Sequence, residues 1–193
     1  MINKELKEYL DNSIKVKKTL FKNFKEIKNS INFITRSIHS GGKVLIAGNG
    51  GSAADAQHLV AEFLVRLQSK VNRKGIAAIT LAQDSSTITA CSNDYNFELL
   101  FARNLETLGS KKDILIVIST SGNSQNIYEV LKVAKKMKIF SIGFFGNKGG
   151  KCKKLTNIPI IVDSRITSHI QEAHITLGHF IFMNVEKKII DKK

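Results

Sequence analysis

Residues 114–124 read Ile-Leu-Ile-Val-Ile-Ser-Thr-Ser-Gly-Asn-Ser, an uncharged apolar run that passes directly into a turn rich in hydroxyl groups. Five consecutive large apolar residues have the length of a strand that is buried on both faces. Similar short apolar runs occur at 44–47, 76–79, 140–144 and 158–162. This pattern predicts a sheet in the interior of an α/β protein.

Segments with helical spacing of apolar residues lie between these runs. We expect helices at 52–67, 95–108, 124–138 and 167–188. Strands that alternate with helices form parallel sheets, so we predict a three-layer α/β sandwich with a mostly parallel five-stranded sheet.

The N-terminal part of the chain adds helices to this core. Residues 1–40 have apolar positions at helical spacing and predict two helices, with a break near Asn29–Ser30 and an end at Gly41–Gly42. Residues 41–193 are expected to hold the α/β core and the C-terminal helix. A length of 193 residues favours a single domain over the whole chain, 1–193.

Composition limits the class of protein. Hydrophobic residues make up 42% of the chain and charged residues 24%, which is ordinary for a globular protein. No apolar segment is long enough to span a bilayer, and the first residues lack the apolar core of a secretory signal. We therefore expect a cytoplasmic protein with no membrane partner. Cys91 and Cys152 form no paired motif and predict no disulfide framework.

The formal charge of +14 comes from 30 basic and 16 acidic residues. Such a charge attracts anions in general, from nucleic acids to phosphorylated metabolites. The lysines are spread over helical segments, and no stripe of arginine and aromatic residues for base recognition is present. We expect a solvated, lysine-rich surface and no nucleic-acid partner.

The hydroxyl-rich turn at 119–124 is a candidate phosphate site. Helix N-terminal amides attract anions, Gly122 allows a close turn, and Ser119, Ser121 and Ser124 offer further donors. A simple N-cap would need one hydroxyl, whereas this turn has four in six residues. The pattern favours phosphate binding over a capping turn.

A second turn, Gly48-Asn49-Gly50-Gly51-Ser52, follows the first predicted strand. It matches neither the dinucleotide-binding fingerprint nor the P-loop. Two such turns at the carboxyl ends of neighbouring strands are typical of a site for a small phosphorylated ligand.

Four polar residues on two predicted helices complete the candidate site. His58 and Glu62 are four residues apart, and Gln171 and His179 are eight apart, so each pair shares a helix face. Spacing alone leaves open whether His58 and Glu62 form a surface pair or part of an acid/base or metal site.

In combination, these motifs resemble the phosphoheptose isomerase family of the sugar isomerase (SIS) superfamily. The resemblance covers almost the whole chain. It rests on the segments 48–52, 58–62, 92–94, 119–124 and 170–174, together with His179. The order of His58, Glu62, Gln171 and His179 is more specific than the serine-rich turn, which non-isomerases share.

The resemblance implies a homotetrameric enzyme that converts sedoheptulose 7-phosphate to D-glycero-D-manno-heptose 7-phosphate through a cis-enediol. This reaction leads to heptose for lipopolysaccharide and other cell-envelope polysaccharides. The implied substrate-binding residues are Asn49, Gly50, Gly51, Ser52, Glu62, Asn93, Asp94, Ser119, Thr120, Ser121, Ser124 and Gln171. The implied zinc ligands are His58, Glu62, Gln171 and His179.

Two catalytic roles compete within this set. Glu62 is the candidate base for the carbon-bound proton, and His179 the candidate acid/base for the oxygens. A zinc ion held by the four implied ligands would instead polarise the carbonyl. A carboxylate bound to zinc is a weaker base, and glutamine is an uncommon zinc ligand, so both roles stay open for Glu62.

Two alternative functions fit the same fold. A non-catalytic SIS-type regulator that binds a sugar phosphate needs the serine-rich turn but has no use for Glu62 and His179. Within the enzyme class, an isomerase of a shorter sugar phosphate, such as a phosphorylated pentose or hexose, is the main alternative.

Overall fold

The computed structural model of the protein describes residues 1–82 and 84–191. Within these residues, five parallel strands form one sheet in the order β2-β1-β3-β4-β5. The strands are β1 (Val44–Gly48), β2 (Ala78–Thr80), β3 (Ile114–Ser119), β4 (Phe140–Gly146) and β5 (Ile158–Val162). The predicted parallel five-stranded sheet is confirmed.

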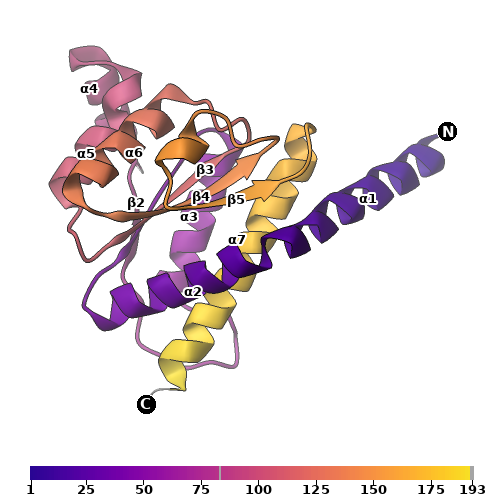
Figure 1. Cartoon of the computed structure of the whole chain (residues 1–193), viewed down its shortest axis with the longest axis horizontal. Coiled ribbons are helices and arrows are strands. Elements are labelled where there is room, and N and C mark those ends of the chain that lie inside the picture. The colour runs from indigo at the N-terminus through magenta and orange to yellow at the C-terminus, as the bar shows by residue number, and fades with distance from the viewer. Residues whose placement is uncertain (83, 192–193) are drawn as a thin grey trace.

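Helices cover both faces of this sheet (Figure 1). The α-helices are α1 (Ile2–Lys18), α2 (Phe24–His39), α3 (Gly51–Leu64), α4 (Ser85–Asp94), α5 (Leu100–Leu108), α6 (Gln125–Met137) and α7 (Thr167–Ile190). Short 3₁₀ helices are η1 (Thr19–Asn23), η2 (Phe97–Leu99) and η3 (Cys152–Leu155).

Alternate residues of each strand belong to two separate hydrophobic cores. In β3, Ile114, Ile116 and Ile118 pack in the core under α2, α3 and α7, whereas Leu115 and Val117 pack in the core under α5 and α6. A strand with both faces covered has no place for charged side chains. Polar groups that bind or react must therefore lie at the ends of strands or on the helices.

The strand order determines where the two polar turns meet. The chain passes from β1 to β2 on one side, and β3 pairs with β1 on the other side, with Gly48 opposite Ile118. The carboxyl ends of β1 and β3 therefore lie side by side at the point where the sheet changes direction. Ligand sites of open α/β sheets form at such a point.

The N-terminal helices break at a different place from the one predicted. The expected break near Asn29–Ser30 is wrong, because α2 runs through it and the buried Ser30 hydroxyl donates to the Glu26 carbonyl inside the helix. The chain bends instead at η1, where the Asn23 side chain exchanges two hydrogen bonds, at 3.0 and 3.1 Å, with the main chain of Ile161. This contact covers the edge strand β5 and has no signal in the apolar spacing.

The segment after β2 also differs from the prediction. One helix was expected at 95–108, whereas α4 ends at Asp94, η2 follows, and α5 begins at Leu100. Asp84 caps α4 by accepting a hydrogen bond from the Thr87 amide at 2.7 Å. Serine and threonine dominate α4 and give it little apolar periodicity, which explains why the pattern missed it.

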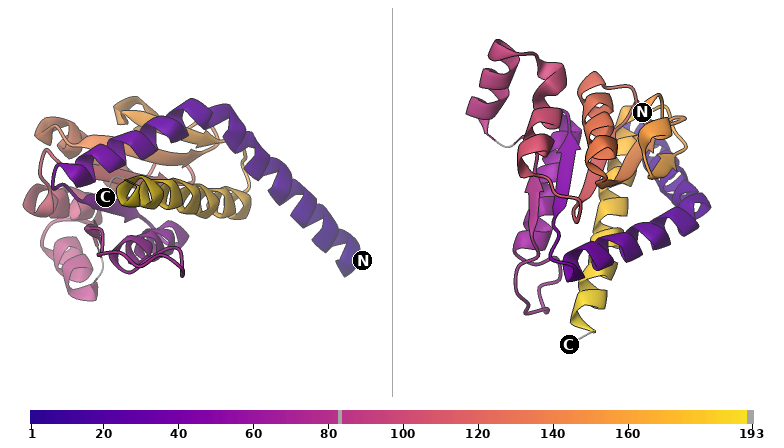
Figure 2. Two further views of the ribbon diagram at one scale, coloured as in Figure 1. Left: turned by 90° about the horizontal axis from the view of Figure 1, so that it is seen from below. Right: turned by 60° about the vertical axis from the view of Figure 1, so that its left-hand side comes forward.

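The first helix, α1, extends away from the body of the molecule and is held at one end by α7 (Figures 1 and 2). Tyr9, Ser13 and Lys17 of α1 all donate hydrogen bonds to the Glu172 carboxylate of α7. These hydrogen bonds lower the pKa of Glu172 to about 2, and the one from Ser13 has the largest effect. Within the described residues, none of the helices is long and apolar enough to cross a membrane.

A buried histidine makes stability depend on pH. His174 of α7 is fully buried, with its ring centroid 6.2 Å from that of Phe144 in β4. Burial lowers the pKa of His174 from its ordinary value of 6.5 to about 4. Between pH 4 and 6.5 His174 binds a proton in the unfolded chain but not in the folded chain. Burial of the neutral His174 is therefore compatible with full stability above pH 6.5, and the free energy of unfolding falls as the pH falls toward 4.

We predict that His174→Asn flattens this pH dependence. The pKa difference corresponds to roughly 3 kcal/mol in the free energy of unfolding between neutral pH and pH 4. Urea unfolding of both proteins at several pH values measures it: the stability advantage of the wild type should shrink by about that amount on acidification. A stability difference that stays constant with pH would contradict the prediction.

Candidate active site

The serine-rich turn connects β3 to α6 and leaves the N-terminus of α6 open. The Ser119 hydroxyl accepts a hydrogen bond from the Gly122 amide at 3.1 Å and lies 3.3 Å from the Ser124 hydroxyl. Ser124 occupies the N-cap position of α6 but forms no side-chain capping hydrogen bond within the described residues. The first amides of α6 are therefore available to an anion, as phosphate binding requires and a simple N-cap does not.

Gly122 fits this turn because of its backbone conformation. Its φ is +65°, and a Cβ there would overlap the carbonyl of Gly149 in the neighbouring turn. The close contact between the two turns holds the serine-rich turn in place.

The turn after β1 is joined through side chains to the first turn of α6, which directly follows the serine-rich turn. Asn49 and Asn126 exchange two hydrogen bonds, each 2.9 Å long. α3 begins at Gly51 after Gly50, whose φ of +56° favours glycine. The N-termini of α3 and α6 thus open at the same edge of the sheet. Both predicted turns lie where the sequence placed them.

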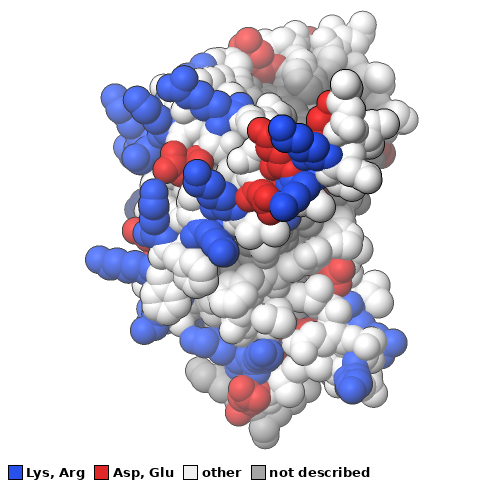
Figure 3. Space-filling model, turned by 90° about the vertical axis from the view of Figure 1, so that its right-hand side faces the viewer, with Lys and Arg blue, Asp and Glu red and all other residues white. Residues whose placement is uncertain are grey.

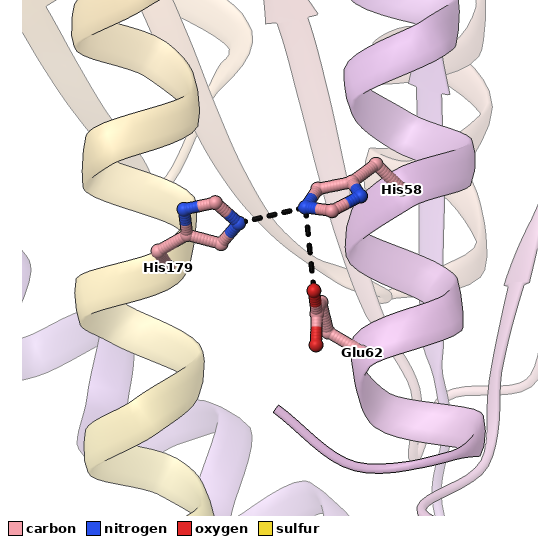
Figure 4. A group of neighbouring side chains, drawn as sticks. All are labelled: His58, Glu62 and His179. Atoms are coloured by element: carbon pink, nitrogen blue, oxygen red, sulfur yellow. Dashed lines mark hydrogen bonds and ion pairs between the residues drawn. The ribbon is translucent and has the colours of Figure 1, made fainter. Parts of the chain in front are cut away.

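His58, Glu62 and His179 lie together on the neighbouring helices α3 and α7 (Figure 4). The two imidazole Nε2 atoms are 2.8 Å apart, and His58 Nε2 is 3.3 Å from a carboxylate oxygen of Glu62. The His58 side chain is 49% exposed and that of Glu62 18% exposed, so the cluster is accessible to a ligand. Since His58 and His179 share one hydrogen bond, one ring donates and the other accepts.

Close packing of α3 against α7 brings these residues together. Gly178 has no side chain, and a Cβ there would overlap Leu59 of α3. One turn further along, the rings of Phe63 and Phe182 stack with centroids 3.7 Å apart. The two helices run side by side in the same direction from Gly51 and Gln171 onward.

The electrostatics of the cluster favour a neutral His179. Burial and then the neighbouring His58 lower the pKa of His179, and Glu62 opposes them. A neutral imidazole can accept a proton near neutral pH.

Asp55 is a further candidate site residue that the sequence motifs did not indicate. It precedes His58 by three residues and Glu62 by seven, so all three share one face of α3. Burial raises the pKa of Asp55, with His58 acting against it. The spacing of three polar residues on one face was the signal that could have identified it.

The remaining predicted residues lie in different places. Gln171 contacts Gly51 at the start of α3, eight residues along α7 from His179. Asn93 donates to Asp94 at 2.9 Å, and Asp94 lines a cavity between α4 and α5. Within the described residues, neither Asn93 nor Asp94 makes a hydrogen bond to the two turns.

The donor set of the cluster suits a divalent metal ion. One donor atom from each of His58, Glu62 and His179 lies within 4.8 Å of the others. Two imidazole nitrogens and one carboxylate are ligands used in catalytic metal sites that keep a further position open.

Comparison with known proteins shows which family has this arrangement. The family model of the SIS domain matches residues 8–146. The chain is 42% identical over 186 residues to the phosphoheptose isomerase of Helicobacter pylori, covering 96% of both chains. It is 44% identical over 194 residues to phosphoheptose isomerase 2 of Campylobacter jejuni, covering 99% of this chain and 96% of that relative.

A solved structure agrees with the sequence comparison. The phosphoheptose isomerase of Neisseria gonorrhoeae superposes with a TM-score of 0.90 at 32% identity, covering 97% of this chain and 100% of that one. With its sheet, its two turns and its α3–α7 cluster, the chain belongs to the phosphoheptose isomerase family of SIS-domain proteins.

Proposed function

We propose that this protein is an aldose–ketose isomerase that converts sedoheptulose 7-phosphate to D-glycero-D-manno-heptose 7-phosphate. The observation that carries the proposal is the cluster of His58, Glu62 and His179, because a protein that only binds a sugar phosphate needs no acid/base pair. Relatives named phosphoheptose isomerase match nearly the full length of the chain. The product would supply heptose for cell-envelope polysaccharide, and a phosphorylated metabolite as substrate favours a cytoplasmic location.

The proposed chemistry moves one carbon-bound proton and one oxygen-bound proton. The Glu62 carboxylate removes the proton from C1 of the ketose, which gives a cis-enediol, and returns it to C2. The neutral imidazole of His179 accepts the proton of the C1 hydroxyl and delivers it to the oxygen on C2. The carbonyl thereby moves from C2 to C1 with no net gain or loss of protons.

We further propose that the cluster holds zinc. His58, Glu62 and His179 would supply three ligands. Gln171, whose side chain lies against Gly51 in this structure, would have to turn toward the cluster to act as a fourth. When bound, zinc would polarise the carbonyl and stabilise negative charge on the enediol oxygens.

The spacing of the site supports a long sugar. The phosphate would bind at the turns containing Ser119, Thr120, Ser121 and Ser124, close to the start of α3. His58 lies seven residues along α3 from Gly51, or about 10 Å at the rise of an α-helix. A sugar that reaches from one to the other has its phosphate several carbons away from the reacting carbonyl, as in a heptose 7-phosphate.

The charge on one face of the molecule supports a metabolite rather than a nucleic acid as the partner of that face. Basic side chains on the face shown in Figure 3 are mixed with acidic and uncharged ones. Nucleic-acid sites usually gather basic residues in one patch.

We predict that the protein isomerises sedoheptulose 7-phosphate faster than shorter ketose phosphates, because only the longer sugar reaches both the turns and the cluster. Aldose formation from a panel of pentulose, hexulose and heptulose phosphates measures this preference. No turnover of any of them would overturn the isomerase proposal, and faster turnover of a shorter ketose would reassign the substrate.

Glu62→Gln is the matched variant for this assay. Loss of the base should lower turnover by about 100-fold or more, while the affinity for sedoheptulose 7-phosphate, measured by calorimetry, stays close to that of the wild type. Unchanged turnover would exclude Glu62 as the base. Zinc content separates the two roles of Glu62, because a variant that retains zinc but not turnover has lost a base rather than a ligand.

The zinc proposal predicts about one zinc ion per chain in protein purified without chelator. His58→Gln should lower the zinc content, whereas His39→Gln, at the exposed end of α2, should leave it unchanged. Metal analysis of the three proteins provides the measurement. Zinc content near zero together with full activity would contradict the proposal.

We also propose that the protein forms a homotetramer. Apolar side chains of α1 are exposed at helical spacing, namely Ile2, Leu6, Tyr9, Leu10 and Ile14. An apolar cavity of about 250 Å³ lies nearby, lined by Leu20, Phe21, Phe24 and Phe180 among others. Apolar surface of this extent marks a protein interface, and a further copy of the chain would cover it.

The tetramer proposal predicts that Leu6→Ser combined with Leu10→Ser produces smaller species in analytical ultracentrifugation. Glu8→Ser changes the opposite side of α1 and should leave the assembly intact. A monomeric wild-type protein would contradict the proposal.

A further inference from the structure

A buried arginine caps the C-terminus of α3, the helix that carries His58 and Glu62. Arg73 belongs to the segment of chain that connects α3 to β2, and its side chain is 5% exposed. Its guanidinium donates to the main-chain carbonyls of Glu62 and Phe63, at 2.9 Å each, and of Lys74 at 3.0 Å. The last carbonyls of a helix have no partner within the helix, and a cation there also interacts favourably with the helix dipole. Arg73 therefore caps α3 at Glu62 itself.

The same guanidinium connects α3 to α7. Arg73 Nε donates to the Glu186 carboxylate at 2.6 Å. Glu186 is completely buried and also accepts hydrogen bonds from the Gln68 side chain at 3.2 Å and the Leu67 amide at 3.4 Å. Glu186 lies seven residues after His179, two turns along the same face of α7. One side chain thus contacts the helix of the candidate base and the helix of the candidate acid/base.

The apolar contacts between these helices do not by themselves fix the axial position of one helix along the other. Leu59 against Gly178 and Phe63 against Phe182 bring α3 and α7 close, but each atom pair in such a contact contributes only about 0.1–0.2 kcal/mol and has no preferred direction. Hydrogen bonds from a planar guanidinium depend strongly on distance and angle. Buried ionic groups have their best-attested role in setting the register of packed helices.

We propose that Arg73 is a positioning residue that fixes the axial register of α3 against α7 and so holds His58 and Glu62 opposite His179. This inference rests on the proposed roles of Glu62 and His179. Because the guanidinium bonds to the Glu62 carbonyl, a change at Arg73 moves Glu62 directly. A displacement of about 1 Å at reacting groups can lower turnover by about 100-fold.

Arg73→Lys tests the proposal because it keeps the charge, but its three donors lie on one nitrogen and cannot reproduce the four bonds of the guanidinium to three carbonyls and a carboxylate. We expect kcat to fall by about 10- to 100-fold. KM should stay within about threefold, since the turns that bind phosphate lie at the other end of α3. Glu186→Gln keeps an acceptor for Arg73 and should retain most of the wild-type kcat.

Asp113→Asn is the control for a purely structural effect. Asp113 is equally buried and pairs with Lys43 at 2.7 Å. It directly precedes β3 and therefore lies at the amino ends of the strands, whereas the two turns lie at the carboxyl ends. This variant should lower the melting temperature while kcat stays at the wild-type value. If Arg73→Lys lowers kcat no more than Asp113→Asn does, Arg73 is a structural residue and the proposal is overturned.

A crystal structure of Arg73→Lys provides a readout that does not depend on activity. An axial shift of α3 along α7 of more than about 0.5 Å supports the proposal, since catalytic groups must be held to about that tolerance. An unchanged register overturns it. If Arg73→Lys does not fold, a crystal structure of the double variant Arg73→Met with Glu186→Met, which leaves no unpaired buried charge, provides the same readout, with the same shift expected. Full turnover by Glu62→Gln would overturn only the proposed role of Glu62 as the base. The crystal structure of Arg73→Lys would still show whether Arg73 sets the register of the two helices.

Discussion

The close contact between α3 and α7 is the interaction on which the candidate site depends. Gly178 allows Leu59 to approach α7, and the stacked rings of Phe63 and Phe182 extend the contact by a further turn. Successive residues of a helix point about 100° apart, so a register change of one residue in either helix would turn His58 or His179 out of the cluster. The site therefore depends on how two helices pack. The buried hydrogen bonds of Glu186 add directional contacts that depend on the axial register of α3 against α7.

The sequence predicted the sheet well because both faces of the strands are buried, and continuous apolar runs such as 114–118 indicate this environment directly. The bend at η1 could not be predicted, since it depends on Asn23 reaching a strand that lies 138 residues away. α4 was missed for the opposite reason. Its cap at Asp84 is local, but α4 is largely exposed and has few apolar residues, so its sequence shows no helical spacing of apolar positions.

The candidate site was predictable in part. The spacing of His58 and Glu62 placed them on one helix face, but only the tertiary packing brings His179 within 2.8 Å of His58. Gln171 and His179 share a helix face, yet the structure places the Gln171 side chain against Gly51, near the turns. Asn93 and Asp94 were assigned through family resemblance, and their role in this chain is still a prediction.

The separation of the turns from the cluster has an electrostatic consequence for the proposed chemistry. A carboxylate that acts as a base must stay ionised while a phosphate dianion is bound in the same site. A carboxylate and a phosphate dianion about 4 Å apart repel by about 8 kcal/mol at an effective dielectric constant of about 20, but by only about 2 kcal/mol at about 16 Å, the helical rise from Gly51 to Glu62. Placing the anion at the helix N-termini and Glu62 about three turns along α3 keeps that repulsion small. Phosphate binding can then hold the far end of the sugar over the cluster without weakening the base that acts there.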